Sequence, residues 1–303
     1  MDVRLSRRNM LVAGGAAIVA PLVLSGDKKV EASVSPLSSS DRAIMGLSGT
    51  DARFPSAVQA LFPGLPQDPV FQKIMPLALL VTHQSGPGVR ALSIEYSITT
   101  PTGTSETPVY LYISPGSKSK GESVSTLGSA RQEILQAGQS RLVTPFFNWT
   151  PAYYQRSSNP DWKSLIQGSE PGDFLVSELS TATEIKVSVD GVVFSDRKLL
   201  GPDKFKLGRR IRARRNAEHD EALGVYKLLQ SGASDDTIRQ TLQSHGSAPR
   251  SNQIRVGQRT YEQARRYHAQ VLLRAFNDAD RNTFTKALIR LKRQKKMVLT
   301  KLG

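Results

Sequence analysis

The chain of 303 residues contains no cysteine, only two tryptophans, and fewer acidic than basic side chains, 26 against 41. The lack of cysteine excludes disulfide bonds, thiolate nucleophiles, iron–sulfur clusters and cysteine-bound zinc. It also makes an oxidising compartment harmless to this chain, since no thiol is present. A hydrophobic content of 39% excludes general disorder. The length predicts about two domains.

The basic residues are concentrated in the last third of the chain. Residues 203–303 carry 23 Lys and Arg against 9 Asp and Glu, a net charge of +14. Residues 1–202 carry 18 basic and 17 acidic groups, so this larger part is nearly neutral. Such asymmetry is typical of a module that faces an anionic partner.

The first 32 residues have the order of regions found in an export signal. Arginines precede an apolar run at 10–24, which contains two glycines and a proline and is short for a bilayer span. The paired arginines followed by two apolar residues resemble a twin-arginine signal, and a small-residue cleavage site follows. We predict export by the twin-arginine translocase to the periplasm or envelope, with an uncleaved anchor or an ordinary secretory signal as alternatives. The signal residues are Ser6, Arg7, Arg8, Met10, Leu11 and Ala32.

The middle of the chain has the period of β-strands. Residues 77–82 form a continuous apolar run, and apolar residues alternate along 91–100, 109–113 and 185–189. A further apolar run follows at 192–194. Asp190-Gly191 lies between two alternating runs and predicts a tight hairpin. No amphipathic helix separates these runs, which favours antiparallel pairing. We predict an antiparallel, immunoglobulin-like β-sandwich over residues 76–202.

The period changes to that of helices after Gly201-Pro202. We expect helices over 209–230 and 234–244, a third that begins at the capping box Thr260–Gln263, and a last one that includes Phe284. The predicted fold class is therefore α+β, with a separate C-terminal α-helical region. The predicted divisions are 1–32, a signal; 33–75, a Ser/Pro-rich linker and lead-in; 76–202, the β-sandwich; and 203–303, the basic helical region.

Four short segments carry a resemblance to known proteins: Leu79–Ser85, Val89–Ala91, Val189–Phe194 and Gly201–Asp203. Together they resemble a group of uncharacterised exported bacterial proteins. In that group a sheet domain leads into a helical C-terminal region. The resemblance covers about residues 76 to 230 and implies the same architecture. It implies no activity.

Catalytic and metal-binding motifs are missing from the sequence. None of the four histidines stands at metal-ligand spacing from another, and neither H-E-x-x-H nor G-x-S-x-G occurs. We interpret Glu218–Glu221 as a solvated helical face, and His83 as a residue that makes a hydrogen bond in a loop. The sequence therefore predicts a protein that is not an enzyme and has neither cofactor nor metal.

An aromatic segment lies between the expected strands. It contains Phe147, Trp149, Tyr153, Tyr154 and, shortly afterwards, Trp162. These rings fit a stacking platform for a sugar or a partner, which would indicate a carbohydrate-binding or carbohydrate-active protein. They also fit a plug for one end of the sheets, and we favour the plug because aromatic side chains bury the most area.

Two basic patches are the candidate binding residues. We expect them to contact an anionic envelope component or an envelope protein, with no nucleic acid as partner if the chain is exported. Without a signal, the same residues would indicate a cytoplasmic nucleic-acid-binding protein. A third reading is that they only keep the helices soluble. The sequence identifies no small-molecule ligand. The patches comprise Arg209, Arg210, Arg212, Arg214, Arg215, Lys292, Arg293, Lys295 and Lys296.

Overall fold

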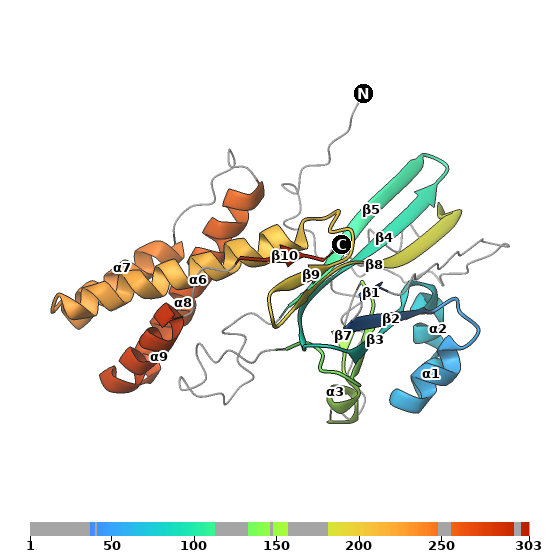
Figure 1. The fold of residues 1–303 in the computed structure, drawn as a ribbon, viewed down its shortest axis with the longest axis horizontal. Coiled ribbons are helices and arrows are strands. Elements are labelled where there is room, and N and C mark those ends of the chain that lie inside the picture. Colours follow the sequence, from blue (N-terminus) through green and yellow to red (C-terminus); the bar gives the residue numbers. More distant parts are fainter. Residues whose placement is uncertain are drawn as a thin grey trace, which may run out of the picture.

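The computed structural model of the chain describes residues 37–39, 41–112, 133–145, 148–156, 181–247, 256–293 and 298–302. The protein is mixed α+β, with two sheets of mostly antiparallel strands and with most of its long helices in the C-terminal part. The long helices project from one end of the sheets (Figure 1). The predicted signal residues Ser6, Arg7, Arg8, Met10, Leu11 and Ala32 lie outside the described residues.

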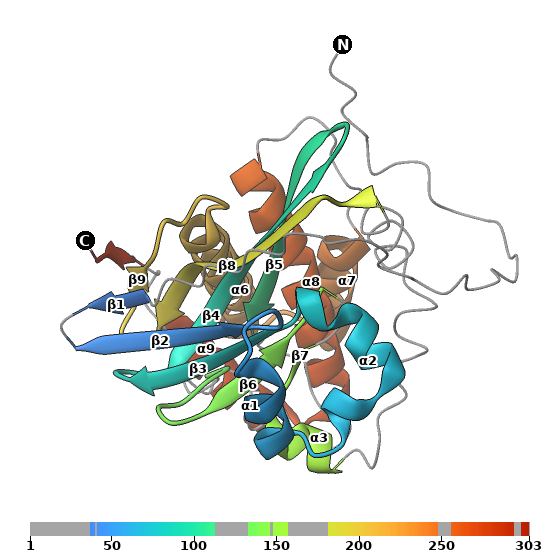
Figure 2. The same ribbon diagram turned by 90° about the vertical axis from the view of Figure 1, so that its right-hand side faces the viewer.

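The first sheet has the strand order β1-β2-β3-β6-β7, with antiparallel pairs throughout. Its strands are β1 (Leu37–Ser39), β2 (Arg42–Ser48), β3 (Leu79–Ser85), β6 (Ser140–Val143) and β7 (Asn148–Trp149). Short helices lie beside it (Figure 2): α1 (Phe54–Leu61), η1 (Leu65–Gln67), α2 (Pro69–Ile74), η2 (Met75–Leu77) and α3 (Pro151–Arg156).

The range 33–75, which the sequence indicated as a linker and lead-in, supplies β1 and β2 of the first sheet, and its short helices pack against that sheet. Phe54 and Val58 of α1 and Phe71 of α2 are fully buried in one cluster with Leu80 of β3 and Leu142 of β6. Phe54 and Val58 are four residues apart and so lie on one face of the helix. The short helices of this range are therefore part of the packed structure.

The second sheet has the order β10-β9-β8-β4-β5. The pair β10–β9 is parallel and the other pairs are antiparallel. Its strands are β4 (Val89–Thr100), β5 (Gly103–Tyr112), β8 (Glu184–Phe194), β9 (Lys198–Leu200) and β10 (Thr300–Lys301). The alternating runs at 91–100 and 185–189 are confirmed as strands, within β4 and β8.

The predicted hairpin at Asp190-Gly191 is wrong, because both residues lie inside the continuous strand β8. Ser93 of β4 pairs with Gly191 and Ile94 pairs with Val189, which leaves Asp190 as the extra residue of a bulge. A side chain at Gly191 would have its Cβ 3.2 Å from the Ser93 hydroxyl, so the glycine serves close packing. The Asp-Gly pair therefore marks a bulge.

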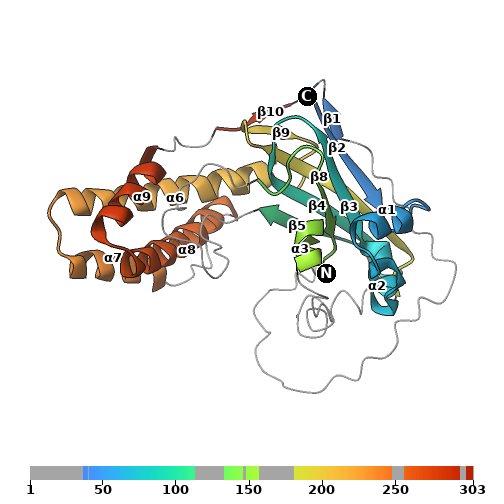
Figure 3. The same ribbon diagram turned by 90° about the horizontal axis from the view of Figure 1, so that it is seen from below.

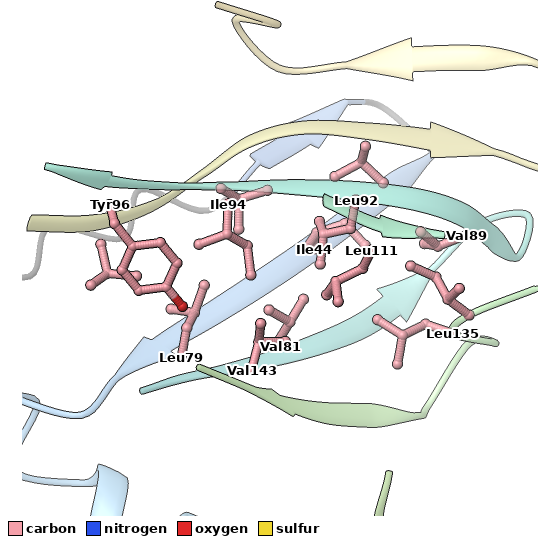
Figure 4. Close-up of a cluster of buried hydrophobic side chains, with 14 of the residues drawn as sticks. Ile44, Leu79, Val81, Val89, Leu92, Ile94, Tyr96, Leu111, Leu135 and Val143 are labelled. Atoms are coloured by element: carbon pink, nitrogen blue, oxygen red, sulfur yellow. The ribbon is translucent and has the colours of Figure 1, made fainter. Parts of the chain in front are cut away.

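The largest apolar core lies between the two sheets. Leu79 and Val81 of β3 lie on one side of it, and Leu92, Ile94 and Tyr96 of β4 lie on the other (Figure 4). All five are buried, as the alternation along β4 predicts. The two sheets are thus packed face to face through side chains that come from both.

The C-terminal helices form a second core of their own (Figure 3). Ser234 caps the second of them, since the Thr237 amide donates to its hydroxyl at 3.2 Å. The third begins earlier than predicted, so that Thr260 lies buried inside it and not at its N-terminus. The helices are α6 (Leu207–Gln230), α7 (Asp235–Ser247), α8 (Val256–Asp278) and α9 (Arg281–Arg293).

The end of the chain returns to the second sheet as β10. The Thr300 amide donates to Arg197 O at 3.2 Å and the Leu302 amide to Leu199 O at 2.8 Å. Leu302 packs against the core between the sheets. The helical region is therefore attached to the sheet at both of its ends, through α6 and through β10.

Candidate functional site

The start of α6 is held on the second sheet by the carboxylate of Asp190. This buried group accepts hydrogen bonds from the Ser93 hydroxyl at 2.9 Å and from the amides of Lys204 and Phe205 at 2.7 and 3.2 Å. The Tyr110 hydroxyl of β5 donates to Phe205 O at 2.9 Å. Because the carboxylate has three donors, it is well satisfied and fixes the loop that precedes α6.

Lys204, the first basic residue of the segment 204–215, is neutralised by two glutamates of the second sheet. The Lys204 ammonium lies 2.8 Å from a Glu95 carboxylate oxygen and 2.6 Å from one of Glu106. The Gly208 amide donates to Asp203 at 3.2 Å. Burial raises the pKa of Asp203, and the Asp190 charge acts in the same direction. Lys204 is therefore part of the attachment of α6 to the sheet.

Helix α6 belongs to both parts of the molecule (Figure 3). Leu207 and Ile211 of its first half pack with Ala91, Val193 and Leu199 of the second sheet. Its second half contributes to the helical core, with Ala222 and Val225 buried there. The outward side of α6 is left to its polar residues.

Two of the five candidate arginines of α6 are exposed. Arg209 and Arg212 lie three residues apart on the outward side. Within the part of the chain that the structure describes, neither side chain makes a hydrogen bond or an ion pair. Arg210 is half-buried, with its guanidinium carbon 4.5 Å from the centroid of the Tyr110 ring. Arg210 therefore faces the sheet, and Arg209 and Arg212 face solvent.

The remaining two arginines point inward. Arg214 and Arg215 are half-buried, and Arg215 Nη1 lies 2.8 Å from a carboxylate oxygen of the buried Glu218. Successive residues of a helix are rotated by about 100°, so a run of arginines covers several directions. The structure does not bring the five together as one contact surface.

The second basic patch lies at the end of α9. Lys292 and Arg293 are exposed, and the Lys292 ammonium lies 4.2 Å from the centroid of the Tyr226 ring on α6. Lys286 and Arg290 are exposed on the same helix. Lys295 and Lys296 lie outside the described residues. The described part of this patch is thus a solvent-facing side of α9.

A polar cluster joins three of the C-terminal helices. The buried carboxylate of Glu221 on α6 lies 2.6 Å from His245 Nδ1 on α7, and Arg265 Nε on α8 donates to it at 2.8 Å. Arg265 Nη2 also lies 3.5 Å from His245 Nε2. A buried carboxylate with two such partners is satisfied, so the cluster fixes how these helices pack.

A second polar contact involves Asp220, the residue before Glu221 on α6. The Tyr261 hydroxyl donates to Asp220 at 2.8 Å, and His219 Nδ1 lies 3.2 Å from the same carboxylate. Burial, together with the hydrogen bond to Asp220, raises the pKa of Tyr261 to about 12. These contacts are internal to the helical region.

The interpretation of Glu218–Glu221 as a solvated face is wrong for its two glutamates. Both are buried, and burial raises the pKa of Glu218. The pattern carried a signal for this, because Glu218 and Glu221 precede Ala222 and Val225 at helical spacing on the apolar side. Their partners on other helices were not visible in the sequence.

His83 makes the expected hydrogen bond, but within strand β3 and not in a loop. His83 is buried, and its Nε2 lies 2.7 Å from the Ser85 carbonyl oxygen. Among the described residues, no three His, Asp or Glu side chains are grouped so that they could hold a metal ion. Nor does any helix in the described ranges have the length and apolar composition needed to cross a membrane.

The aromatic candidates do not share one exposed surface. Trp149 is buried, and the Tyr154 ring lies 5.8 Å from it and 5.5 Å from Phe62 of the segment after α1, centroid to centroid. Tyr153 is exposed. Phe147 and Trp162 lie outside the described residues. Trp149 and Tyr154 therefore act as packing residues on the first sheet.

Comparison of the chain with protein-family models, with curated proteins and with solved structures found no match.

Proposed function

We propose that this protein is exported, is not an enzyme, and binds an anionic component of the cell envelope through the outward face of its helical region. The observation that carries the proposal is the exposure of Arg209 and Arg212, which have no partner among the described residues. They belong to a region whose net charge is +14. An exposed and unneutralised cationic face raises the local concentration of anionic groups.

We further propose that the two sheets form an immunoglobulin-like sandwich. In such domains one sheet has the order A-B-E-D and the other contains G-F-C, extended by C′ in the variable type. The orders β2-β3-β6 and β9-β8-β4-β5 match A-B-E and G-F-C-C′ in both pairing and sequence succession. The strands β1, β7 and β10 are additions to this pattern. The strand order supports the immunoglobulin-like assignment.

The experiment is co-sedimentation of the protein with vesicles that contain phosphatidylglycerol, at increasing salt. Each arginine near such a surface contributes about 1 kcal/mol, so Arg209→Gln with Arg212→Gln is expected to weaken binding about 30-fold. Binding of the unchanged protein is expected to fall steeply with salt. Equal binding at low and high salt would refute the electrostatic mechanism.

A matched control removes the same charge from paired arginines. Arg239 lies 3.1 Å from Asp236 and Arg281 lies 3.2 Å from Asp235. Arg239→Gln with Arg281→Gln is expected to reduce vesicle binding much less than the variant on the outward face. If both double variants weaken binding equally, net charge alone acts and the face on α6 has no special role.

Export is tested separately by cell fractionation and N-terminal sequencing. We expect the mature chain to begin at Ser33 and to be found outside the cytoplasm. An intact N-terminus in a soluble cytoplasmic pool would contradict export. It would favour nucleic acid as the partner of the same cationic face.

A further inference from the structure

Strand β10 covers the outer edge of β9 in the second sheet (Figure 3). This pair is parallel, whereas the other pairs of the sheet are antiparallel. The Thr300 amide donates to Arg197 O at 3.2 Å, and the Leu302 amide donates to Leu199 O at 2.8 Å. The outer edge of β9 therefore offers main-chain acceptors to an added strand, and the structure shows these acceptors in use.

Two leucines beside these hydrogen bonds contact the sheet on its opposite faces. Leu299 packs in the apolar cluster at the start of α6, and Leu302 packs against the core between the two sheets. Residues three apart in an extended strand point to opposite sides, so both contacts are made by one straight segment. A Cβ at Gly208 would lie 3.3 Å from Leu299 Cδ1, so the glycine lets this side chain approach α6. A segment at this edge is thus recognised by two apolar side chains three residues apart.

The attachment of β10 is largely exposed to solvent. Thr300 and Lys301 are exposed, Val298 is 71% exposed, and both leucines are only half-buried. Parallel pairing is also slightly less stable per residue than antiparallel pairing. A segment with few buried apolar contacts and solvent-exposed hydrogen bonds opens locally while the rest of the fold stays intact. We therefore expect β10 to open far more often than the central strands of the sheet.

Strand β9 has an attachment of its own, so its edge persists when β10 opens. Leu199 and Leu200 pair with β8 and are buried. Arg197 lies in the turn between β8 and β9, where its amide donates to Phe194 O at 3.0 Å. The acceptor carbonyls of Arg197 and Leu199 are therefore held in place by β8 and do not depend on β10.

We propose that the outer edge of β9 binds an extended segment of another protein, and that β10 is a displaceable strap that occupies this edge until the partner arrives. The chemistry of the partner follows from the segment that the edge holds. It pairs in parallel through its main-chain amides and has apolar side chains at its first and fourth positions. Thr300 and Lys301 are exposed, so the two positions between the apolar ones add little selectivity.

A strap of this kind protects the edge and sets the affinity that a partner needs. An uncovered edge strand pairs with unrelated chains, and β10 prevents this. Because β10 is attached to the same chain, its local concentration at the edge is high, so a second copy gains nothing by offering the same four residues. A partner that makes further contacts outside these four positions gains affinity over the strap and displaces it.

The first test is hydrogen exchange of the full chain, followed by nuclear magnetic resonance. The amides of Thr300 and Leu302 are expected to exchange about 100-fold faster or more than those of β4, because local opening releases β10 without unfolding the sheet. Exchange of these two amides as slow as that of β4 would overturn the proposal, since the strap would then not be displaceable.

The second test measures binding of a fluorescent peptide with the sequence of residues 298–303 to full-length variants. Thr300→Pro removes the amide that donates to Arg197 O and is expected to raise the apparent affinity for the peptide about 10-fold, because the edge is free more often. Lys301→Pro is the matched control. Alternate amides of a strand point to opposite edges, so this proline lies on the side away from β9 and is expected to leave the affinity as in the unchanged protein.

The peptide itself supplies the remaining controls. A peptide with serine in place of both leucines is expected to bind at least about 10-fold more weakly. Arg209→Gln with Arg212→Gln is expected to bind the peptide as the unchanged protein does, which separates this edge from the cationic face. If Thr300→Pro does not fold, Leu299→Ser replaces it.

Three results would overturn the proposal. They are the absence of peptide binding by the folded strap variant, equal affinity in Thr300→Pro and Lys301→Pro, and equal binding of the leucine and serine peptides. Light scattering decides between occupants. Dimers of the unchanged protein that disappear in Thr300→Pro would assign the edge to a second copy of this chain, and would overturn its assignment to another protein.

Discussion

Replacement of His268 by glutamine is expected to change how the stability of the protein depends on pH. The pKa of His268 is lowered to about 3, first by burial and then by Arg214 and Arg215. In the unfolded chain the pKa of a histidine is about 6.5. Between these two values the unfolded state binds a proton that the folded state does not. The stability that the neutral imidazole supports is therefore present above pH 6.5 and is lost as the pH falls toward 3.

The magnitude follows from the width of this window. Each pH unit below 6.5 costs about 1.4 kcal/mol, because one proton separates the two states. From pH 7.5 to pH 5, the free energy of unfolding is expected to fall by about 2 kcal/mol more in the unchanged protein than in His268→Gln. Glu218, whose pKa is raised by burial, acts in the opposite sense, but it is common to both proteins.

The assay is urea unfolding of both proteins at pH 7.5, 6 and 5, at low and high salt. Salt screens the arginine charges but leaves burial unchanged, so most of the difference is expected to persist at high salt. Parallel pH dependence of the two proteins would refute the reasoning. A difference that disappears in salt would assign the effect to the arginines and not to burial.

Two other substitutions test packing at single positions. Gly49→Ala places a Cβ 1.6 Å from the Met75 carbonyl oxygen and is expected to destabilise the protein by about 3 kcal/mol or more in urea unfolding. The control Gly224→Ala, in an exposed part of α6 with open space, is expected to stabilise it by about 0.5–1 kcal/mol, and the reverse order would contradict the backbone placement. The Tyr96 hydroxyl points into the apolar interior (Figure 4) and has no hydrogen-bond partner among the described residues. Tyr96→Phe is expected to raise the free energy of unfolding by about 1 kcal/mol, and a loss of similar size would show that the hydroxyl is bonded.

The regular elements were predictable because their signals are local. Leu92, Ile94, Tyr96 and Ile98 alternate in the sequence and all point into the core. The helical period after Gly201-Pro202 likewise predicted a helix over 209–230, which the structure has as α6, and Ser234 marked the start of α7. A two-residue or 3.6-residue period of apolar residues indicates which face of a strand or helix is apolar, and that face is then expected to be buried.

Contacts between distant residues were not predictable in this way. Asp190-Gly191 has the composition of a turn, but Ser93, Lys204 and Phe205 supply the donors that make it a bulge. Glu221, His245 and Arg265 are far apart along the chain and meet only when α6, α7 and α8 pack. The sequence pattern around one residue of such a contact does not indicate which distant residue it will meet.

The charge of the C-terminal region is a property of composition, and no folding event alters its sum of +14. Whether each charged side chain faces solvent or is partly buried depends on how its helix packs. The first half of helix α6 packs against the sheet and its second half packs in the helical core. These two contacts fix the orientation of the helix, so that Arg209 and Arg212 are exposed and Arg214 and Arg215 are half-buried. One run of arginines is thus divided between solvent and a half-buried side of the helix, because the surface against which a helix packs decides which of its side chains are buried.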